Sequence, residues 1–321
     1  MKLSIVIPCC FETRLERTIN RIKLLCQDDL PEIVVVYDGD RARNYCIDYP
    51  KHLLIEIENE NREGTSFSRH VGTMAASHNA IFTTDGHCDW RDGQNFAARL
   101  LELVQAHPDD FLCCRMRKIT KQHLYLQDSS DVSTGARLFL RVNDSAGKKV
   151  LCARWQRGAD GIIPIAMGAG YAFDRRRYVE RLSMPWRVNI GWGLDEITFC
   201  LANWVCGGET RMVDVEIGHP FDYRKIAPPA NRAPAKTFSN RIAMLRWLPM
   251  SQETRGYLMD WIADVPFYAS RKEVIESVMR HDVIDELKAA YSSEPRNFDQ
   301  FIKTFNCTDR ILSNDNKNTA F

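Results

Sequence analysis

The sequence lacks several features that would assign it to a class directly. None of its apolar stretches approaches the roughly 20 consecutive residues that span a bilayer, and the apolar run after Met1 is too short for a signal peptide. The formal net charge is only +1 over 321 residues, so no global excess of basic charge favours nucleic acid or a membrane surface as a partner. The length allows one large domain, or one domain with an extension.

The cysteines do not form a disulfide or zinc-ribbon pattern. There are eleven, an odd number, and they contain no C-x-x-C spacing. Two pairs are adjacent in the sequence, Cys9-Cys10 and Cys113-Cys114. This usage is typical of reduced, mostly buried thiols, and it indicates a cytoplasmic protein.

Two common nucleotide-binding motifs are also absent. The first apolar run ends in Pro8 and is followed by Cys9 to Glu12, without the G-x-G-x-x-G turn of a dinucleotide-binding domain. There is no Walker lysine motif, and Gly168-Ala169-Gly170 lacks a third glycine. Carboxylates follow the strands instead, at Asp38 and Asp85, where they could bind a ribose, a base or a cation that neutralises phosphates.

The first third of the chain alternates between two periodicities. Continuous apolar runs at residues 3–7, 33–37, 53–57 and 80–84 predict strands buried on both faces. Apolar residues at helical spacing predict helices at 14–26, 66–76 and 95–106. The order strand, helix, strand with short links predicts an α/β sheet. Farther along, the runs 136–142 and 149–155 flank a turn-rich link and predict an antiparallel hairpin.

The strongest local signal is Asp85-Gly86-His87, directly after the buried run 80–84. Gly86 permits a sharp turn, so a carboxylate and an imidazole stand side by side at the carboxyl end of a strand, where α/β sheets bind ligands. We interpret Asp85 and His87 as ligands of a divalent cation that holds a nucleotide diphosphate. His219 also follows a predicted strand and a glycine. Alone it would be read as structural, but with Asp85 and His87 it becomes a candidate third ligand.

A second signal is Gly191-Trp192-Gly193-Leu194-Asp195-Glu196, which opens a predicted helix. Acids in a first helical turn are favoured by the helix dipole, so a pure capping role remains one interpretation of Asp195 and Glu196. The other interpretation is that one acid acts on the substrate beside Trp192.

The order of these motifs resembles that of the polypeptide N-acetylgalactosaminyltransferases, within the GT-A class of nucleotide-sugar transferases. The resemblance extends from about Leu3 to about Arg241. Its segments are Arg62-Glu63-Gly64 with Ser68-Arg69 and Gly72, Phe82 to Cys88 around the D-x-H motif, Met167 to Arg175 with Gly168 and Gly170, Gly191 to Phe199 with Trp204 to Gly208, and Gly218-His219-Pro220-Phe221.

The resemblance implies a GT-A (Rossmann-like) α/β fold with a mixed central sheet. It also implies an enzyme that uses manganese, or another divalent cation, to transfer a hexose or N-acetylhexosamine from a UDP-sugar to a hydroxyl with retention of configuration. Asp85, His87 and His219 would bind the metal, and Trp192 would form a wall of the sugar pocket. The remaining donor-binding residues would be Asp38 at the uridine, Arg62 beside it, and Gly64, Arg69, Asp85, Gly170 and Arg224.

The acid helix departs from the family pattern. Alignment on Trp192 places Asp195 at the family's acid, whereas alignment on the helix favours Glu196. The same segment resembles the inverting β-1,4-galactosyltransferases, in which an acid serves as the base. Inversion therefore stays open as an alternative to retention.

The acceptor is not defined by the sequence. A protein Ser/Thr hydroxyl follows from the resemblance, and a hydroxylated base in viral DNA is the alternative; a non-catalytic nucleotide-sugar-binding protein is a further one. Basic residues after His219 form either a solvated loop or a lid over the diphosphate: Arg224, Lys225, Arg232, Lys236 and Arg241.

We expect residues 1–240 to form the catalytic domain and 241–321 a helical extension, which either helps to recognise the acceptor or only stabilises the core. The family's membrane anchor and lectin domain have no counterpart in the sequence, so we expect a cytoplasmic bacterial or viral protein with no membrane partner.

Overall fold

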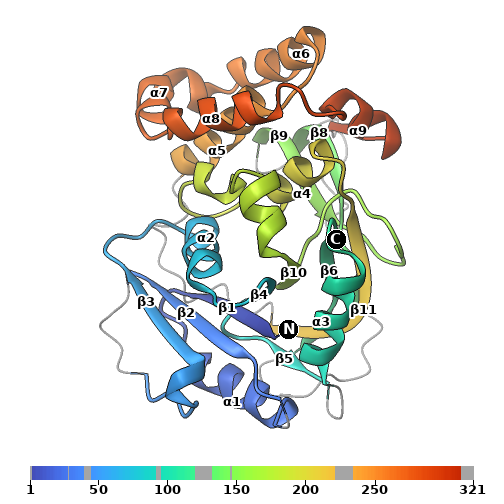
Figure 1. The fold of residues 1–321 in the computed structure, drawn as a ribbon. Helices are drawn as coiled ribbons and strands as arrows, with labels where there is room; N and C mark the ends of the chain where they lie inside the picture. The colour runs from blue at the N-terminus through green and yellow to red at the C-terminus, as the bar shows by residue number, and fades with distance from the viewer. Residues whose placement is uncertain are drawn as a thin grey trace.

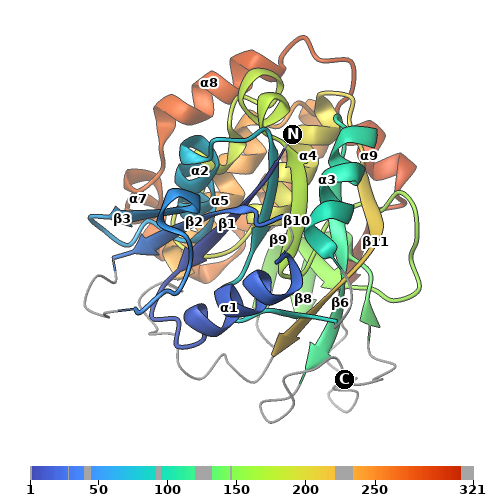
Figure 2. The same cartoon turned by 60° about the horizontal axis from the view of Figure 1, so that its bottom comes forward.

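The computed structural model describes residues 2–27, 29–39, 45–91, 95–119, 132–144, 147–220 and 234–311. A mixed sheet runs through the molecule, with helices on both of its faces (Figure 1, Figure 2). The first half of this sheet is parallel, in the order β3-β2-β1-β4, and it confirms the four strands expected from the apolar runs. These strands are β1 (Leu3–Cys9), β2 (Glu32–Asp38), β3 (Leu54–Asn59) and β4 (Ala80–Thr84).

The second half makes the sheet mixed, as expected for a GT-A fold. Strand β10 lies antiparallel between β4 and β6, and β11 pairs parallel with β6. Two short strands, β5 and β7, pair with β11 and β6 respectively. The bounds are β5 (Asp89–Trp90), β6 (Phe111–Ile119), β7 (Val132–Ser133), β10 (Gly170–Asp174) and β11 (Thr210–Pro220).

Alternate residues of the parallel strands enter two different cores. In β1, Val6 packs into one core, whereas Ile5 and Ile7 pack into the other. Burial on both faces explains why these runs are continuously apolar and do not alternate. Helices α1 (Leu15–Leu25) and α3 (Phe96–Ala106) cover one face; α2 (Thr65–Ala75) and α4 (Asp195–Val205) lie on the other.

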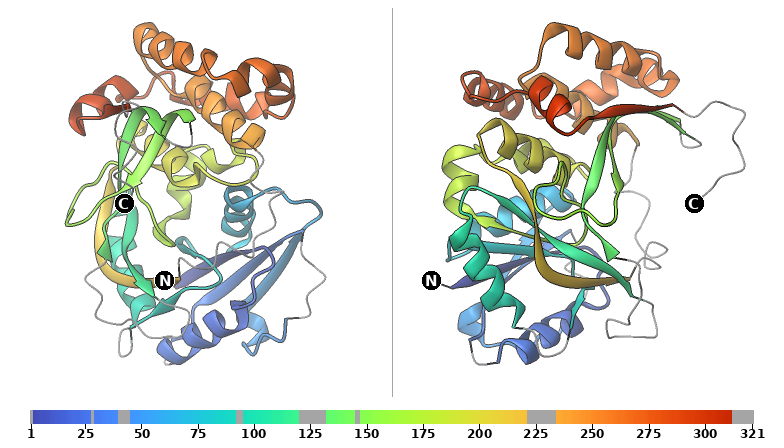
Figure 3. Two further views of the ribbon diagram at one scale, coloured as in Figure 1. Left: turned by 180° about the vertical axis from the view of Figure 1, so that it is seen from behind. Right: turned by 90° about the vertical axis from the view of Figure 1, so that its right-hand side faces the viewer.

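The expected hairpin is present and forms a second, smaller sheet. Strands β8 (Ala136–Asp144) and β9 (Gly147–Trp155) pair antiparallel. A short strand near the end of the described chain, β12 (Thr308–Ile311), pairs parallel with β8, so the sheet order is β12-β8-β9 (Figure 3). Leu151, in the middle of β9, has a positive φ of 49°, an uncommon conformation for a residue with a side chain.

The C-terminal helices form a layer above the core (Figure 1). Apolar residues at helical spacing predict helices at 254–262, 271–280 and 283–292, and the structure confirms a helix at each place: α6 (Gln252–Ala263), α7 (Pro266–Ser277) and α8 (His281–Tyr291). Two more were not predicted, α5 (Pro234–Trp247) and α9 (Phe298–Thr304), and the expected domain boundary at residue 240 falls inside α5. Among the described residues, no helix has both the length and the apolarity needed to cross a membrane.

One tryptophan connects α4 to these C-terminal helices. Trp204, near the end of α4, packs against both Phe301 and Phe305, with ring centroids 5.5 and 5.4 Å away. Its indole nitrogen donates a hydrogen bond to the carbonyl of Asn297 at 3.2 Å, and Arg296 stacks over the ring at 4.4 Å. The far end of the acid-bearing helix is therefore fixed by α9.

We expect Trp204→Ala to lower the free energy of unfolding by about 3–5 kcal/mol, because it leaves a cavity between α4 and α9. Trp204→Phe keeps an aromatic ring in place and should lose clearly less. Denaturant unfolding followed by circular dichroism measures both. An alanine variant as stable as the phenylalanine variant would show that α4 does not depend on this contact.

Candidate active site and metal site

Asp85 and His87 lie on a tight turn held from two sides. The backbone N–H of Asp85 donates to the carbonyl of Ala169 at 3.3 Å, and the Thr18 hydroxyl on α1 donates to the carbonyl of Gly86 at 2.9 Å. A β-carbon at Gly86 would lie 2.8 Å from the Cγ atom of Glu12, so only glycine fits there without displacing that side chain. The turn thus fixes both side chains at the end of β4.

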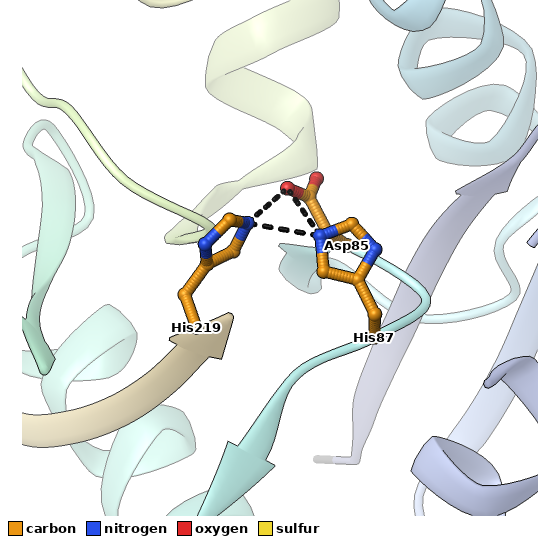
Figure 4. Close-up of side chains that lie close together, drawn as sticks. All are labelled: Asp85, His87 and His219. Atoms are coloured by element: carbon orange, nitrogen blue, oxygen red, sulfur yellow. Dashed lines mark hydrogen bonds and ion pairs between the residues drawn. The ribbon is translucent and has the colours of Figure 1, made fainter. Parts of the chain in front are cut away.

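His219 comes from β11 and completes the group (Figure 4). One ligand atom from each of Asp85, His87 and His219 lies within 4.8 Å of the others. The two imidazole Nε2 atoms are 2.9 Å apart, and the Asp85 Oδ2 atom is 3.4 Å from His219 and 3.9 Å from His87. The structure therefore brings together the three residues that the sequence proposed as ligands.

The surroundings of His87 fit a metal ligand. Its Nδ1 atom lies 2.6 Å from the carboxylate of Glu12, which is buried. A carboxylate at Nδ1 fixes the imidazole so that Nε2 presents its lone pair toward His219 and Asp85. Two imidazole nitrogens 2.9 Å apart need a proton or a cation between them. Two imidazoles and one carboxylate suit a divalent transition metal, and three protein ligands leave positions open for phosphate oxygens.

The charges around the triad shift the pKa values of its members. Burial raises the pKa of Asp85, but the hydrogen bond from His219 and the charges of His87 and Arg69 outweigh it and lower the pKa to about 2. Burial lowers the pKa of His87, but Glu12 and Asp85 outweigh it, so the net shift is upward. Asp85 is thus an anion at neutral pH, and a metal ion at this site competes with a proton on His87.

Arg69 lies between the metal triad and the acid helix. Its side chain is only 2% exposed and pairs with Asp85 at 3.3 Å and with Asp195. Its guanidinium carbon also lies 5.2 Å from the ring centre of Tyr171. Both carboxylates satisfy a buried cation, so Arg69 fixes the distance between the end of β4 and the start of α4.

The two acids of α4 have different surroundings. Asp195 is buried against Arg69, whereas Glu196 accepts a hydrogen bond from the Tyr171 hydroxyl at 2.8 Å. The same hydroxyl lies within hydrogen-bond distance of the Gly168 carbonyl, which can only accept. Tyr171 has one proton for two acceptors, so it can donate to only one of Glu196 and Gly168 at a time. Burial raises the pKa of Glu196, and the charge of Arg69 opposes this only in part.

Four other expected donor-binding residues are placed as follows. Both carboxylate oxygens of Asp38 accept backbone N–H groups, from Glu63 at 2.9 Å and from Gly64 at 3.0 Å. Gly64 has a φ of 99°, and a β-carbon there would overlap the Gly191 backbone.

Arg62 stacks over Phe11 at 4.3 Å. Gly170 is buried in the sheet, where a β-carbon would press on Phe82 and Ile217. Arg224 lies outside the described residues.

A cavity of about 760 Å³ joins these groups. Its lining includes nine of the expected residues, but Arg62 and Gly170 are not among the residues lining it. Beyond the triad it reaches β9 and α5. The nine residues are Asp38, Gly64, Arg69, Asp85, His87, Trp192, Asp195, Glu196 and His219.

The lid expectation is wrong for Arg241. This residue lies in α5, is buried, and donates to the carbonyl of Val150 on β9 at 2.8 Å, so it is a structural link and no part of a mobile loop. Lys236 also lies in α5, whereas Arg224, Lys225 and Arg232 fall outside the described residues.

Two functional residues were missed by sequence reasoning, Glu12 and Tyr171. Glu12 follows the carboxyl end of β1, the same kind of position that singled out Asp38 and Asp85, so a signal was available. Tyr171 gave no signal, because a tyrosine within an apolar strand is typical of a core residue.

Part of the chain matches a family of known proteins. Residues 4–149 match the family model described as "Glycosyl transferase family 2". The matched range contains Asp38, Asp85 and His87 and ends before Asp195 and His219. The family match supports the expected class, a glycosyltransferase.

Solved structures are similar to the chain over most of its length. The crystal structure of GalNAc-T7 with UDP, GalNAc and Mn2+ is 21% identical, covers 96% of this chain with a TM-score of 0.60, and supports the GT-A fold. The chain spans 55% of that protein. The crystal structure of S. aureus TarS 1-349 in complex with UDP-GlcNAc is 12% identical, with 91% of each chain covered and a TM-score of 0.49.

We expect Glu12→Gln to weaken Mn²⁺ binding by about 10- to 100-fold, because the amide fixes the His87 imidazole less well than the carboxylate does. Titration calorimetry with Mn²⁺ measures the affinity. Glu102→Gln, on the exposed side of α3, is the matched control and should bind Mn²⁺ like the unaltered protein. Equal affinities of the two variants would contradict a supporting function for Glu12.

Proposed function

We propose that this protein is a metal-dependent glycosyltransferase that moves a hexose or N-acetylhexosamine from a UDP-sugar to a hydroxyl acceptor. The observation that carries the proposal is the group Asp85, His87 and His219 at one end of a cavity that also contains Asp195 and Glu196. The similarity to GalNAc-T7, whose crystal structure contains UDP, GalNAc and Mn2+, supports UDP-sugar as the donor and manganese as the metal.

The charges near the triad support metal dependence. Asp85 and Asp195 both pair with the single guanidinium of Arg69, and a third carboxylate, Glu12, lies against His87. A diphosphate that approaches these groups meets net negative charge, because Arg69 is already paired twice. A divalent cation held by Asp85, His87 and His219 would reverse the local sign and stabilise the charge of the departing diphosphate.

The transfer breaks one bond and forms another at the anomeric carbon. The acceptor oxygen bonds to this carbon, and the bond from the carbon to the diphosphate oxygen breaks with its electron pair on UDP. The acceptor's proton leaves with the diphosphate if configuration is retained, or goes to a carboxylate if it is inverted. Arg69 keeps Asp195 and Asp85 in place, and Trp192 gives the sugar an apolar wall at the cavity.

We assign Glu196 as a hydrogen-bond donor, the function that accompanies retention. Burial raises its pKa, so the carboxyl group keeps its proton to a higher pH than an exposed glutamic acid does. In this assignment Glu196 donates to a hydroxyl of the bound donor, and Asp195 remains the ionised partner of Arg69. The alternative is inversion, in which Glu196 takes the acceptor's proton.

The first test of the function is hydrolysis and binding of UDP-sugars. With Mn²⁺, we expect UDP to bind and UDP-sugar to be hydrolysed slowly without an acceptor; His219→Ala should lose both. His52→Ala removes an exposed histidine far along the sequence from the triad and should change neither. UDP-sugar that binds without turnover would indicate a non-catalytic binding protein, and no UDP binding with any divalent metal would refute the proposal.

The second test distinguishes a donor from a base at Glu196. We expect Glu196→Gln to keep most of the activity, because the amide still donates, and Glu196→Ala to lose about 10-fold, as for one lost hydrogen bond to a polar partner. The raised pKa keeps the carboxyl protonated above its ordinary value of 4.5, and the donor is lost as pH rises through it. The glutamine variant should not show this loss in kcat measured at saturating Mn²⁺.

A base would behave in the opposite way. Glu196→Gln would then lower kcat by about 10²- to 10⁴-fold, and the activity of the unaltered protein would fall toward low pH. The anomeric configuration of the product, read by NMR, gives an independent answer, since a base at Glu196 accompanies inversion.

A further inference from the structure

The charged residues that line the cavity fall into two groups. Among the described lining residues, every carboxylate belongs to the group around the triad, which we call the catalytic end: Glu12, Asp38, Asp85, Asp195 and Glu196. The part of the lining formed by β9 and α5 contributes Lys149, Arg154 and Arg241, and no carboxylate among the described residues. The wall that remains for an acceptor is therefore cationic, although the chain as a whole is nearly neutral.

Two indole rings remain partly in solvent on this cavity. Trp192 is 52% exposed and Trp155, at the end of β9, is 37% exposed, and both line the cavity. Most large apolar side chains of the described chain are buried, so exposed rings at a concave site indicate a ligand surface. The flat face of an indole binds another flat ring by stacking.

Two of these cations belong to one strand. Lys149 and Arg154 both lie in β9, and both line the cavity. The β9 part of the lining is therefore basic.

Given the proposed glycosyltransferase function, we propose that the β9–α5 half of the cavity binds the acceptor, and that the acceptor is a hydroxyl-bearing nucleobase in a single-stranded nucleic acid. Trp155 stacks on a base, and Arg154 and Lys149 bind the phosphates of the strand. Aromatic rings combined with a basic groove are the general means by which proteins bind single strands. The hydroxyl oxygen of the base bonds to the anomeric carbon, UDP leaves with the electron pair, and the hydroxyl proton leaves on UDP.

A peptide acceptor fits these observations less well. A neutral Ser/Thr peptide would not use the cations, and an acidic peptide would use them without offering Trp155 a flat ring to stack on. A ligand that carries both a flat ring and phosphates uses Trp155 and the cations together.

The experiment measures acceptor binding separately from donor binding. A fluorescein-labelled single-stranded oligonucleotide with one hydroxymethylated pyrimidine is titrated with the protein, UDP and Mn²⁺, and anisotropy is followed at several salt concentrations. We expect Arg154→Glu to weaken binding at least about 10-fold and to reduce the salt slope by roughly 0.7, the value for one phosphate contact. Trp155→Ala should weaken it roughly 5- to 100-fold with the slope unchanged, and Trp155→Phe should restore most of the affinity.

Two controls keep the result interpretable. Lys272→Glu places the same charge change on the exposed side of α7 and should not alter oligonucleotide binding. UDP binding should be unchanged in the Arg154 and Trp155 variants, which shows that they are folded and that the donor side is intact. Transfer of sugar to the oligonucleotide, detected by mass spectrometry, then confirms the acceptor.

Three results would overturn the inference while the proposed function survives. One is sugar transfer to a Ser/Thr peptide by a protein that binds UDP but not the oligonucleotide. Another is equal competition by a base-free phosphodiester polymer, which would show that stacking contributes nothing. The third is oligonucleotide binding that is unchanged in Arg154→Glu. A protein that fails to bind UDP at all refutes the glycosyltransferase proposal itself, which is a separate outcome.

Discussion

The ion pairs of Arg69 are the constraint on which the site depends. A buried guanidinium between Asp85 and Asp195 joins two segments that are 110 residues apart in the sequence, the turn after β4 and the start of α4. Removal of either carboxylate would leave a buried charge without full compensation, which costs several kcal/mol in typical proteins. The same cation also lies over Tyr171, whose hydroxyl holds Glu196. Asp85 and both acids of α4 are therefore positioned by one side chain that does not itself need to touch a substrate.

The C-terminal helices hold the site from outside. Arg280, just before α8, pairs with Glu63 at 2.6 Å and stacks over Phe67 at 4.4 Å. The backbone N–H of Glu63 donates to Asp38, and its carbonyl accepts from the N–H of Gly191. The helical layer therefore stabilises the segments around Gly64 and Gly191 through Glu63. Arg241 of α5 fixes β9 in the same manner. The division at residue 240 stays a prediction, but the contacts show that the two parts share their packing.

The sequence was most informative where one local rule decides the structure. Continuous apolar runs identified the parallel strands, and the parallel direction brings their carboxyl ends, with Asp38 and Asp85, to one edge. Pairing between distant residues follows no such rule. The packing of whole elements decides such pairs. It brings Arg69 to Asp195, and it places Arg241 in a helix against β9. Glu12 occupied a position that the strand-end rule covers, yet only its contact with His87 gave it a function.

The distribution of charge along the cavity also orders the events that the site can support. In the proposed function, the paired carboxylates of the catalytic end would repel a diphosphate until Asp85, His87 and His219 bind a divalent cation. At the β9 end, the lining cations attract anions without any metal. An anionic acceptor and an anionic donor would compete for this basic wall if the catalytic end stayed negative. Cation binding would remove that competition, because it would give the diphosphate a positive site of its own. In the proposed reaction the metal ion would thus determine where each substrate lies, in addition to any effect on the bond that breaks.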